Sequence, residues 1–371
     1  PSRKLYGFDS SDWSDTPGQM DTSRVRDDYQ RFLMENGVYG PDSGLAHGSN
    51  QNGWVARPYH MDERVHFTHW CADRALRFLE RRDATVPFFL KVSIHAPHAP
   101  CTPPAYYFNK YMNMDLPEPK VADWARVFDE PQRGLEVASW RTSLDPIVMK
   151  QYMAGYYGCI EHVDHQIGRI LDHIPENTVI MFTSDHGEML GNHGLWGKGN
   201  LHEFSVNIPM ILMPPANRGD LAPGRLDDRL AVQADIMPTL LELASIPVPD
   251  SVEGRSLVGD DRRDQVYGEI WENDNATRMV RDRRYKLIYY PVGNRFQMFD
   301  LQEDPVEMND LSDEPQYSRE RERLTDLLIE RLYGGDLDWL KDGRLVGAPN
   351  VEAVPHPNPR RMFGTARGWR F

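Results

Sequence analysis

The sequence is poor in cysteine, with three residues in a chain of 371: Cys71, Cys101 and Cys159. Their number is odd, their spacing is wide and no C-x-x-C pair occurs, which argues against a disulfide framework and against a cysteine zinc site. Free cysteine is among the most buried residue types, and Cys71 and Cys159 lie in helical patterns. We therefore expect these two thiols to fill apolar space on the buried faces of helices.

Long apolar runs and dense basic stretches are also missing. No run of about 18 apolar residues occurs, so we expect no membrane span. The net charge is -14, and the one dense basic stretch is short and lies at residues 360–370. This charge argues against nucleic acid as a partner. Residues 1–4 lack the apolar core of a signal peptide, and the sequence points to no compartment.

Helical and extended patterns alternate over the first two thirds of the chain. Residues 1–60 are rich in Gly, Asp, Ser and Asn without periodicity, which indicates long surface loops. Apolar spacing predicts helices over 68–81, 147–173 and 235–244, and apolar runs predict strands over 87–94, 178–184 and 208–213. This alternation is typical of an α/β fold with a mainly parallel sheet sandwiched by helices.

The pattern changes after Gly259. Four short strands are predicted over 266–271, 277–280, 285–291 and 296–301, followed by a helix over 318–332. We therefore divide the chain into an α/β domain over 1–262, a smaller antiparallel α+β subdomain over 263–340 and an extended tail over 341–371. In that tail Trp369 and Phe371 are candidates for packing on a second copy of the chain, as a homo-oligomer contact.

The first polar cluster follows the predicted strand 178–184. Asp185 and His186 can supply one oxygen and one nitrogen ligand to a divalent cation, and Gly187 lets the backbone turn sharply beside them. Lys198 lies in a glycine-flanked loop, where a flexible ammonium can reach an anion as a point charge. On composition alone, an ordinary turn with a surface lysine explains the segment equally well.

The second polar cluster consists of His95 and His98, in a proline-bounded loop after the predicted strand 87–94. A histidine at such a place can bind a substrate oxyanion or act as a general acid. The alternative is a structural histidine that bonds to nearby backbone. Ligands of such sheets bind beyond the carboxyl ends of the strands, where both clusters are predicted to lie.

Several segments together resemble the sulfatase family of the alkaline phosphatase superfamily. Residues 183–209 resemble the second signature region of that family. Four further segments agree with it in order: residues 88–104, the "DxQIGRI" phrase at 164–170, "DIMPTLLELA" at 235–244 and the "FDLxxDP" turn at 299–305. The resemblance covers residues 60–312 and implies an alkaline phosphatase-like fold.

The resemblance also implies a reaction and a site. Asp185 and His186 would be metal ligands, while His98 and Lys198 would contact the sulfate and serve in catalysis. His95 and His193 receive no firm role. The implied reaction is hydrolysis of a small-molecule or glycan sulfate ester with a formylglycine nucleophile and one divalent cation, calcium. The Asp-His pair also occurs in phosphonate monoester hydrolases, so a phosphonate monoester or phosphodiester hydrolase using manganese is the alternative.

The sequence departs from the family at the nucleophile. The motif C-x-P-S-R or S-x-P-S-R is not found, since residues 1–3 resemble only its end and residues 4–9 continue differently. We therefore expect the nucleophile, two acidic ligands, a lysine and a histidine to lie outside this chain. A short homologue that binds sulfated ligands without catalysis is the other explanation. Six loop aromatics are candidates either for stacking on a substrate ring or for the core: Trp13, Trp54, Tyr59, Tyr106, Tyr107 and Trp124.

Overall fold

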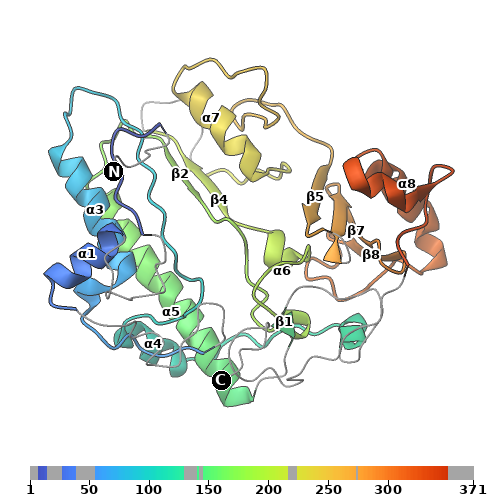
Figure 1. Cartoon of the computed structure of the whole chain (residues 1–371), viewed down its shortest axis with the longest axis horizontal. Helices are drawn as coiled ribbons and strands as arrows, with labels where there is room; N and C mark the ends of the chain where they lie inside the picture. Colours follow the sequence, from blue (N-terminus) through green and yellow to red (C-terminus); the bar gives the residue numbers. More distant parts are fainter. Residues whose placement is uncertain are drawn as a thin grey trace. The chain divides into compact units, whose positions relative to one another are not determined.

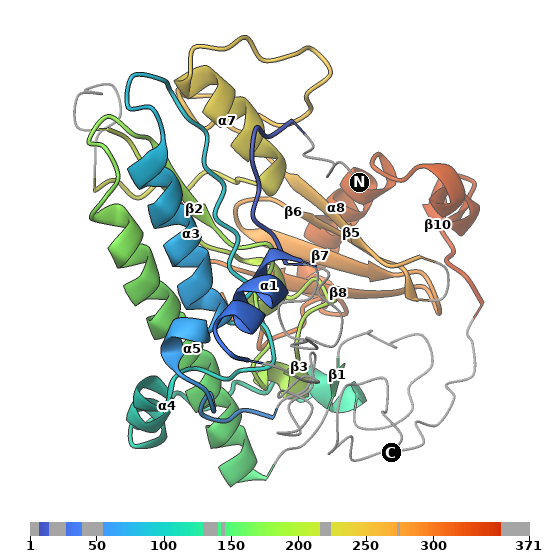
Figure 2. The same ribbon diagram turned by 60° about the vertical axis from the view of Figure 1, so that its left-hand side comes forward.

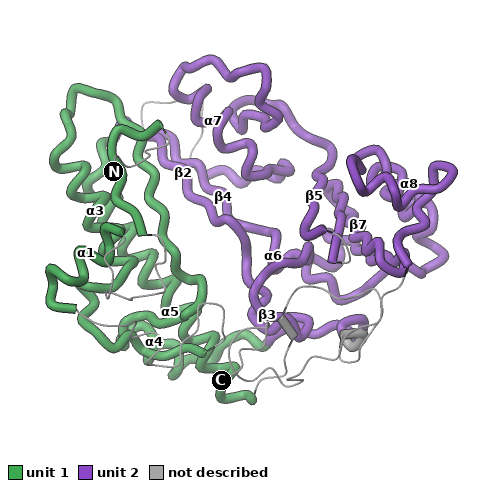
Figure 3. The backbone as a smooth tube through the Cα atoms, viewed as in Figure 1, with its two compact units in different colours: residues 1–118, 143–175, 360–371 green, residues 119–142, 176–359 purple. Residues whose placement is uncertain are grey.

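The computed structural model describes residues 7–14, 27–38, 55–128, 140–141, 145–215, 224–272 and 275–349. The chain forms two compact units (Figure 3). Unit 1 comprises Pro1–Glu118, Ser143–Pro175 and Arg360–Phe371, and unit 2 comprises Pro119–Thr142 and Glu176–Pro359. The domain boundaries predicted at 262 and 340 stay predictions. Over the described ranges, no helix combines the length and the apolar character needed to cross a membrane.

Unit 1 is helical (Figure 1). Its helices are α1 (Asp28–Glu35), the 3₁₀ helix η1 (Glu63–Val65), α3 (Phe67–Arg81), α4 (Ala105–Met112) and α5 (Pro146–Leu171). Polar side chains start the longer ones: the His66 side chain accepts the Thr68 N–H, and Asp145 accepts the Ile147 N–H. The structure confirms the predicted helices at α3 and α5. Helices α1 and α4 lie where we expected loops.

Helix α5 packs against α3 and α4 in the interior of unit 1. Gly155 allows this packing, since a Cβ there would lie 2.5 Å from the Cβ of Ala56 and 2.8 Å from the Cys101 carbonyl oxygen. Cys71 and Cys159 are buried in α3 and α5, as predicted. Cys101 is buried too, and none of the three cysteines forms a disulfide.

Residues 87–94, predicted as a buried strand, belong to no strand ladder in the described part of the chain. The Phe89 side chain is 63% exposed, and its ring stacks on that of Phe8 at 5.9 Å between centroids. An apolar run indicates a segment suited to burial, but a strand also needs a neighbour for its backbone groups. That neighbour is not among the described residues.

The first sheet of unit 2 is a two-stranded ribbon of β2 (Ile180–Thr183) and β4 (Met210–Met213), both at predicted positions. The strands run antiparallel, with Ile180 opposite Met213 and Thr183 opposite Met210. Seven of their eight residues are apolar, yet none is buried. Helix α7 (Ile236–Leu243) confirms the helix predicted over 235–244.

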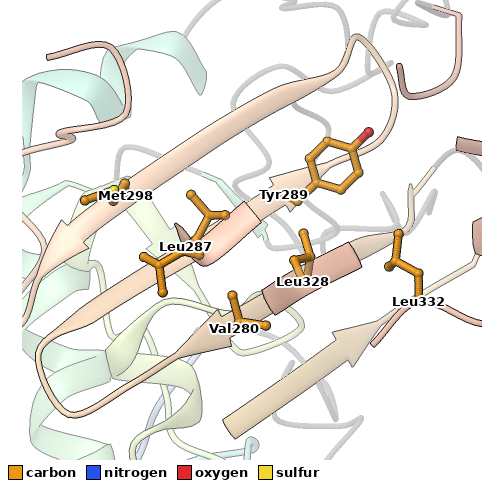
Figure 4. Packing of buried hydrophobic residues seen from close by; sticks show 7 residues of the cluster. Val280, Leu287, Tyr289, Met298, Leu328 and Leu332 are labelled. Atoms are coloured by element: carbon orange, nitrogen blue, oxygen red, sulfur yellow. The ribbon is translucent and has the colours of Figure 1, made fainter. Parts of the chain in front are cut away.

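The second sheet of unit 2 confirms the predicted antiparallel subdomain (Figure 2). Its strands are β5 (Val266–Ile270), β6 (Thr277–Arg281), β7 (Tyr285–Tyr290) and β8 (Arg295–Asp300), in that order. Helix α8 (Ser318–Ile329) covers one face, where Leu328 packs with Leu287 and Tyr289 (Figure 4). On the other face Ile288 and Tyr290 pack with Leu201, since strand residues alternate between faces.

Short elements complete unit 2. They are η2 (Asp123–Phe128), β1 (Trp140–Arg141), η3 (Asn192–Gly194), β3 (Leu195–Trp196), α6 (Glu203–Val206), η4 (Gln233–Asp235), η6 (Pro315–Tyr317) and η7 (Gly334–Trp339). The predicted extended tail begins instead with a hairpin of β9 (Leu340–Lys341) and β10 (Arg344–Leu345). Trp369 and Phe371 lie outside the described residues.

Candidate active site

Asp185 and His186 follow the end of β2, as predicted, and their side chains face each other. The distance between Asp185 Oδ2 and His186 Nε2 is 3.7 Å. The Gly187 carbonyl oxygen can only accept, so His186 Nδ1 donates to it at 2.8 Å. In the neutral ring this leaves the lone pair on Nε2. The Asp185 side chain is 84% exposed, which leaves room for other groups to approach.

The backbone around this pair is fixed from two sides. Gln233 Nε2 donates to the carbonyl oxygens of Ser184 and Asp185 at 2.9 and 2.8 Å. The Gly187 N–H donates to the Ser205 carbonyl oxygen at 2.8 Å. A Cβ at Gly187 would lie 2.1 Å from the Phe204 carbonyl oxygen, so only glycine fits there. The sequence had indicated Gly187 as a turn residue, whereas Gln233 carried no signal that predicted its role.

The Asp185–His186 pair fits part of a metal site. A carboxylate oxygen and an imidazole nitrogen 3.7 Å apart can both reach one cation. The bond from His186 Nδ1 to a backbone carbonyl is also the usual arrangement that orients a ligating histidine. Across the described ranges, no group of three or more His, Cys, Asp or Glu is placed to hold a metal ion. These two residues are therefore at most part of a ligand set.

The loop that carries Lys198 is held by the neighbouring Glu188. Its Oε1 accepts the N–H groups of Gly197 and Leu190 at 2.6 and 3.2 Å. Burial lowers the pKa of Lys198, while the carboxylates of Glu188 and Asp185 raise it. The Asp185 carboxylate thus acts on the pKa of Lys198, while a site shared by Asp185, His186 and Lys198 stays a prediction. Glu188 was missed, although it directly follows the Asp-His-Gly segment.

A buried ionic network anchors the segment that follows Lys198. Lys286 Nζ, on β7, donates to Glu203 Oε1 at 2.8 Å and to Glu307 Oε1 at 2.7 Å. Arg281 adds a bond to Glu203 Oε1 at 3.0 Å. The side chains of Lys286 and Glu307 are fully buried. This network connects the signature segment to the C-terminal sheet, and no sequence pattern had indicated the pairing.

His193, which received no role from the sequence, is a structural residue. Its Nδ1 accepts the Ala122 N–H at 3.3 Å, and its Nε2 donates to the Val306 carbonyl oxygen at 3.0 Å. These bonds define the neutral ring, and burial lowers the pKa of His193. The ring is 1% exposed, so it joins two loops rather than meeting a ligand.

His95 and His98 belong to unit 1, whereas Asp185, His186 and Lys198 belong to unit 2. His98 Nδ1 donates to the Ala99 carbonyl oxygen at 2.8 Å, and the His98 N–H donates to the His95 carbonyl oxygen at 3.0 Å. The neutral His98 ring therefore carries its lone pair on Nε2. That the two clusters share one site stays a prediction.

The loop aromatics divide between interior and surface. Tyr107 is buried, Tyr59 packs on the cluster around Tyr29, and Trp124 donates from Nε1 to the Glu307 carbonyl oxygen at 2.7 Å. Tyr106 is 69% exposed and Trp13 is 39% exposed. Trp54 lies outside the described residues. Three of these six aromatics, Tyr59, Tyr107 and Trp124, thus pack inside the protein, which was the alternative to stacking on a substrate ring.

Comparison with known proteins gives matches along most of the chain. The sulfatase family model matches residues 18–246, and the model for the N-sulphoglucosamine sulphohydrolase C-terminal region matches residues 191–332. An arylsulfatase of Clostridium perfringens is 35% identical over 341 residues, covering 89% of this chain and 71% of that enzyme. The chain spans 61–65% of the length of three further curated relatives.

Solved structures share the fold. A phosphonate monoester hydrolase of Agrobacterium radiobacter superposes with a TM-score of 0.67 at 25% identity, covering 86% of this chain and 72% of that one. A protein solved with D-glucosamine-2-N,6-O-disulfate superposes with a TM-score of 0.62 at 23% identity, covering 71% and 69%. These likenesses confirm the predicted alkaline phosphatase-like fold.

Proposed function

Because this chain belongs to the sulfatase family, we propose that it is the larger part of a hydrolase that cleaves sulfate esters. The arrangement of Asp185, His186 and Lys198 in unit 2 carries the proposal. His186 Nε2, which carries the lone pair of the neutral ring, lies 3.7 Å from the Asp185 carboxylate, and that carboxylate opposes the lowering of the Lys198 pKa by burial. An anionic ester requires such a combination of cation ligands and fixed positive charge.

Asp185 and His186 would hold a divalent cation together with ligands from outside this chain. Calcium favours oxygen ligands, whereas an imidazole nitrogen is better suited to a softer transition-metal ion. The family resemblance favours calcium for a sulfatase and manganese for a phosphonate monoester or phosphodiester hydrolase. When bound, the cation would withdraw charge from the ester oxygens.

Lys198 and His98 would act on the substrate directly. The Lys198 ammonium would pair with a sulfate oxygen and stabilise negative charge that develops during cleavage. His98 would hydrogen-bond a sulfate oxygen, or protonate the leaving oxygen, through Nε2, because its Nδ1 donates to the Ala99 carbonyl oxygen. Both roles require the imidazolium form of His98, since Nε2 of the neutral ring carries the lone pair and has no hydrogen to donate.

The nucleophile would come from outside this chain as a formylglycine. Cys101 begins the segment Cys-Thr-Pro-Pro, which shares the first and third positions of the family motif but not its serine and arginine. Its side chain is fully buried, and its Sγ lies 3.5 Å from the Pro97 carbonyl oxygen. A buried thiol held in this way cannot attack a bound ester.

Intact mass and peptide mapping of the natural gene product test the first part of the proposal. A further polypeptide segment with a cysteine-derived formylglycine is expected. A single species of 42.8 kDa would contradict the proposed hydrolase and favour binding of sulfated ligands without catalysis. Binding of a sulfated glycan by the complete gene product, with no turnover, would support that alternative.

Replacement of the site lysine tests the second part. Lys198→Ala should lower kcat about 10²–10³-fold, since loss of one such charge contact typically has this effect. Thermal unfolding should stay near that of the wild type. The matched control is Lys341→Ala, which removes an exposed lysine of the same unit. Near-wild-type kinetics for Lys198→Ala would remove this lysine from the site.

Phosphonate monoester hydrolysis is the second candidate, supported by the likeness to the Agrobacterium radiobacter enzyme. Parallel rates on an aryl sulfate and an aryl phosphonate monoester, each with calcium and with manganese, separate the two. We expect the higher kcat/KM for the sulfate with calcium. A higher kcat/KM for the phosphonate with manganese would replace the first proposal by the second.

A further inference from the structure

Trp271 directly follows β5 and lies beside the loop of Lys198. Its indole Nε1 donates to the carbonyl oxygen of Gly199 at 3.1 Å. The ring nevertheless stays 45% exposed, although tryptophan is usually well buried. An aromatic ring is thus anchored at one edge, next to a candidate anion-binding residue, with a large part of its surface open to solvent.

The backbone of Trp271 is strained and firmly held. Its φ of 59° lies in the left-handed region, which is unfavourable for a bulky side chain. Arg278 holds the turn, because its guanidinium donates to the Trp271 carbonyl oxygen at 3.0 Å. That guanidinium is buried and forms two bonds to Asp336, at 2.6 and 2.8 Å. Strain that the surroundings maintain in this way is concentrated at functional sites.

Gly199 brings the loop and the ring together. A Cβ at Gly199 would lie 3.5 Å from the nearest ring atom of Trp271, so the indole is in contact with the residue that follows Lys198. The indole therefore lies beside the backbone next to Lys198, which is the placement needed for a ring-bearing anion bound at Lys198 to reach it.

We propose that Trp271 is a substrate-binding platform on which the ring of a sulfate ester's organic group stacks, while its sulfate meets Lys198. This inference rests on the proposed function of Lys198. The chemical class it selects is a ring-bearing ester, aryl or pyranosyl, over an acyclic alkyl sulfate, because only a ring offers a flat face to the indole.

Equilibrium binding tests the platform, with calcium and with manganese, in the natural gene product with its formylglycine cysteine replaced by alanine, so that the ester probes are bound but not cleaved. The probes are phenyl sulfate, glucose 6-sulfate, ethyl sulfate and inorganic sulfate. A stacked ring should tighten binding about two- to thirteen-fold over ethyl sulfate, which corresponds to the roughly 0.5–1.5 kcal/mol of aromatic stacking. The phenyl and glucose probes show whether the stacked ring is aryl or pyranosyl.

Two variants separate stacking from support of the loop. Trp271→Ala should abolish the advantage of the ring-bearing esters and leave ethyl sulfate and inorganic sulfate within about two-fold of wild type. Trp271→Phe loses the bond to Gly199 but keeps a ring, so it should retain most of that advantage. The matched control is Tyr333→Ala, which removes a 61% exposed aromatic whose hydroxyl bonds to Glu269 instead.

The outcomes are distinct. If the wild type binds inorganic sulfate and ethyl sulfate but gains nothing from a ring, the platform is wrong and the proposed site stands. If Trp271→Ala and Trp271→Phe both weaken inorganic sulfate, Trp271 only positions the loop and the platform is again overturned. If the wild type binds neither sulfate nor a sulfate ester, both the proposed function and the proposed platform are wrong.

Discussion

The two units differ in the charges that they bury, although both bury neutral histidines, such as His66 in unit 1 and His193 in unit 2. Unit 1 buries histidines kept neutral, and His66 represents them: it accepts the Thr68 N–H at Nδ1 and donates from Nε2 to the Thr102 carbonyl oxygen. Burial lowers the pKa of His66 to about 4. Unit 2 buries full charges in pairs, with Lys286 between Glu203 and Glu307.

This difference indicates which changes lower the folding stability of each unit. Protonation of a buried neutral histidine lowers the free energy of unfolding, because the unfolded chain binds the proton more readily than the folded chain does. A buried ion pair tolerates moderate changes of pH but not the loss of one partner, because the remaining charge is then buried alone. Acid should therefore weaken both units through their buried histidines, whereas single substitutions of charge should be most damaging in unit 2.

The largest expected effect is from Lys286→Met. The variant leaves Glu307 without a cation and should lower the free energy of unfolding by about 3–5 kcal/mol, measured by denaturant titration. The double variant Lys286→Met with Glu307→Gln removes the stranded charge and should recover most of that loss, since Glu203 keeps Arg281. A loss below about 1 kcal/mol for Lys286→Met would contradict the contrast between the units.

The second largest effect is the loss of folding stability that we expect when His66 is protonated at low pH. The pKa of His66 in the folded chain is about 4, against a usual value of 6.5, so the unfolded state takes up the proton first. The stabilising effect of this neutral ring is complete above pH 6.5. It is lost as the pH falls toward 4, on the order of 3 kcal/mol in total. Denaturant titrations between pH 7 and 4 measure it.

His66→Asn provides the control for that titration. Asparagine can also accept the Thr68 N–H at the start of α3, yet it does not titrate. The free energy of unfolding of this variant should fall less steeply with acid than that of the wild type. The groups around His66 are Tyr59, His69 and His162, which remain in both proteins. An unchanged pH dependence would show that His66 is not the group that titrates.

The smallest effect is expected from an exposed ion pair in unit 1. Arg64 bonds to Asp62 at 2.8 Å, and both side chains are largely exposed. Water and salt screen such a pair, so Arg64→Ala should leave the melting temperature unchanged within about 1 °C. A clear drop in melting temperature would show that burial does not distinguish the two classes of charge in this chain.

Segments with a periodic apolar pattern could be predicted from the sequence. Contacts between residues that are far apart in the sequence could not. Helices α3 and α5 and the four strands β5 to β8 have strong apolar patterns, and the structure has them where they were predicted. Helix α1 was missed because its short amphipathic pattern lies within a loop-like composition. The run at 87–94 shows the opposite error, since composition indicates burial without supplying a neighbouring strand.

The candidate site shows the same limit. Asp185, His186 and Lys198 could be predicted because they are close together in one recognisable segment. The contacts of Glu203 with Lys286 and of Trp271 with Gly199 join residues 83 and 72 positions apart. Such contacts depend on how strands and loops meet in space, which no local pattern records. Candidate site residues could therefore be proposed from the sequence, whereas the residues that contact and support them could not.

The exposed ribbon of β2 and β4 has a consequence for handling the protein in solution. Ile211 and Met213 are 57% and 45% exposed on a ribbon whose outer edges have no partner strand among the described residues. Unpaired edges with apolar side chains recruit strands from other molecules. At high concentration we expect this chain, taken alone, to form β-rich oligomers and turbid solutions. Preparations of it will then depend on dilution and storage time as much as on buffer.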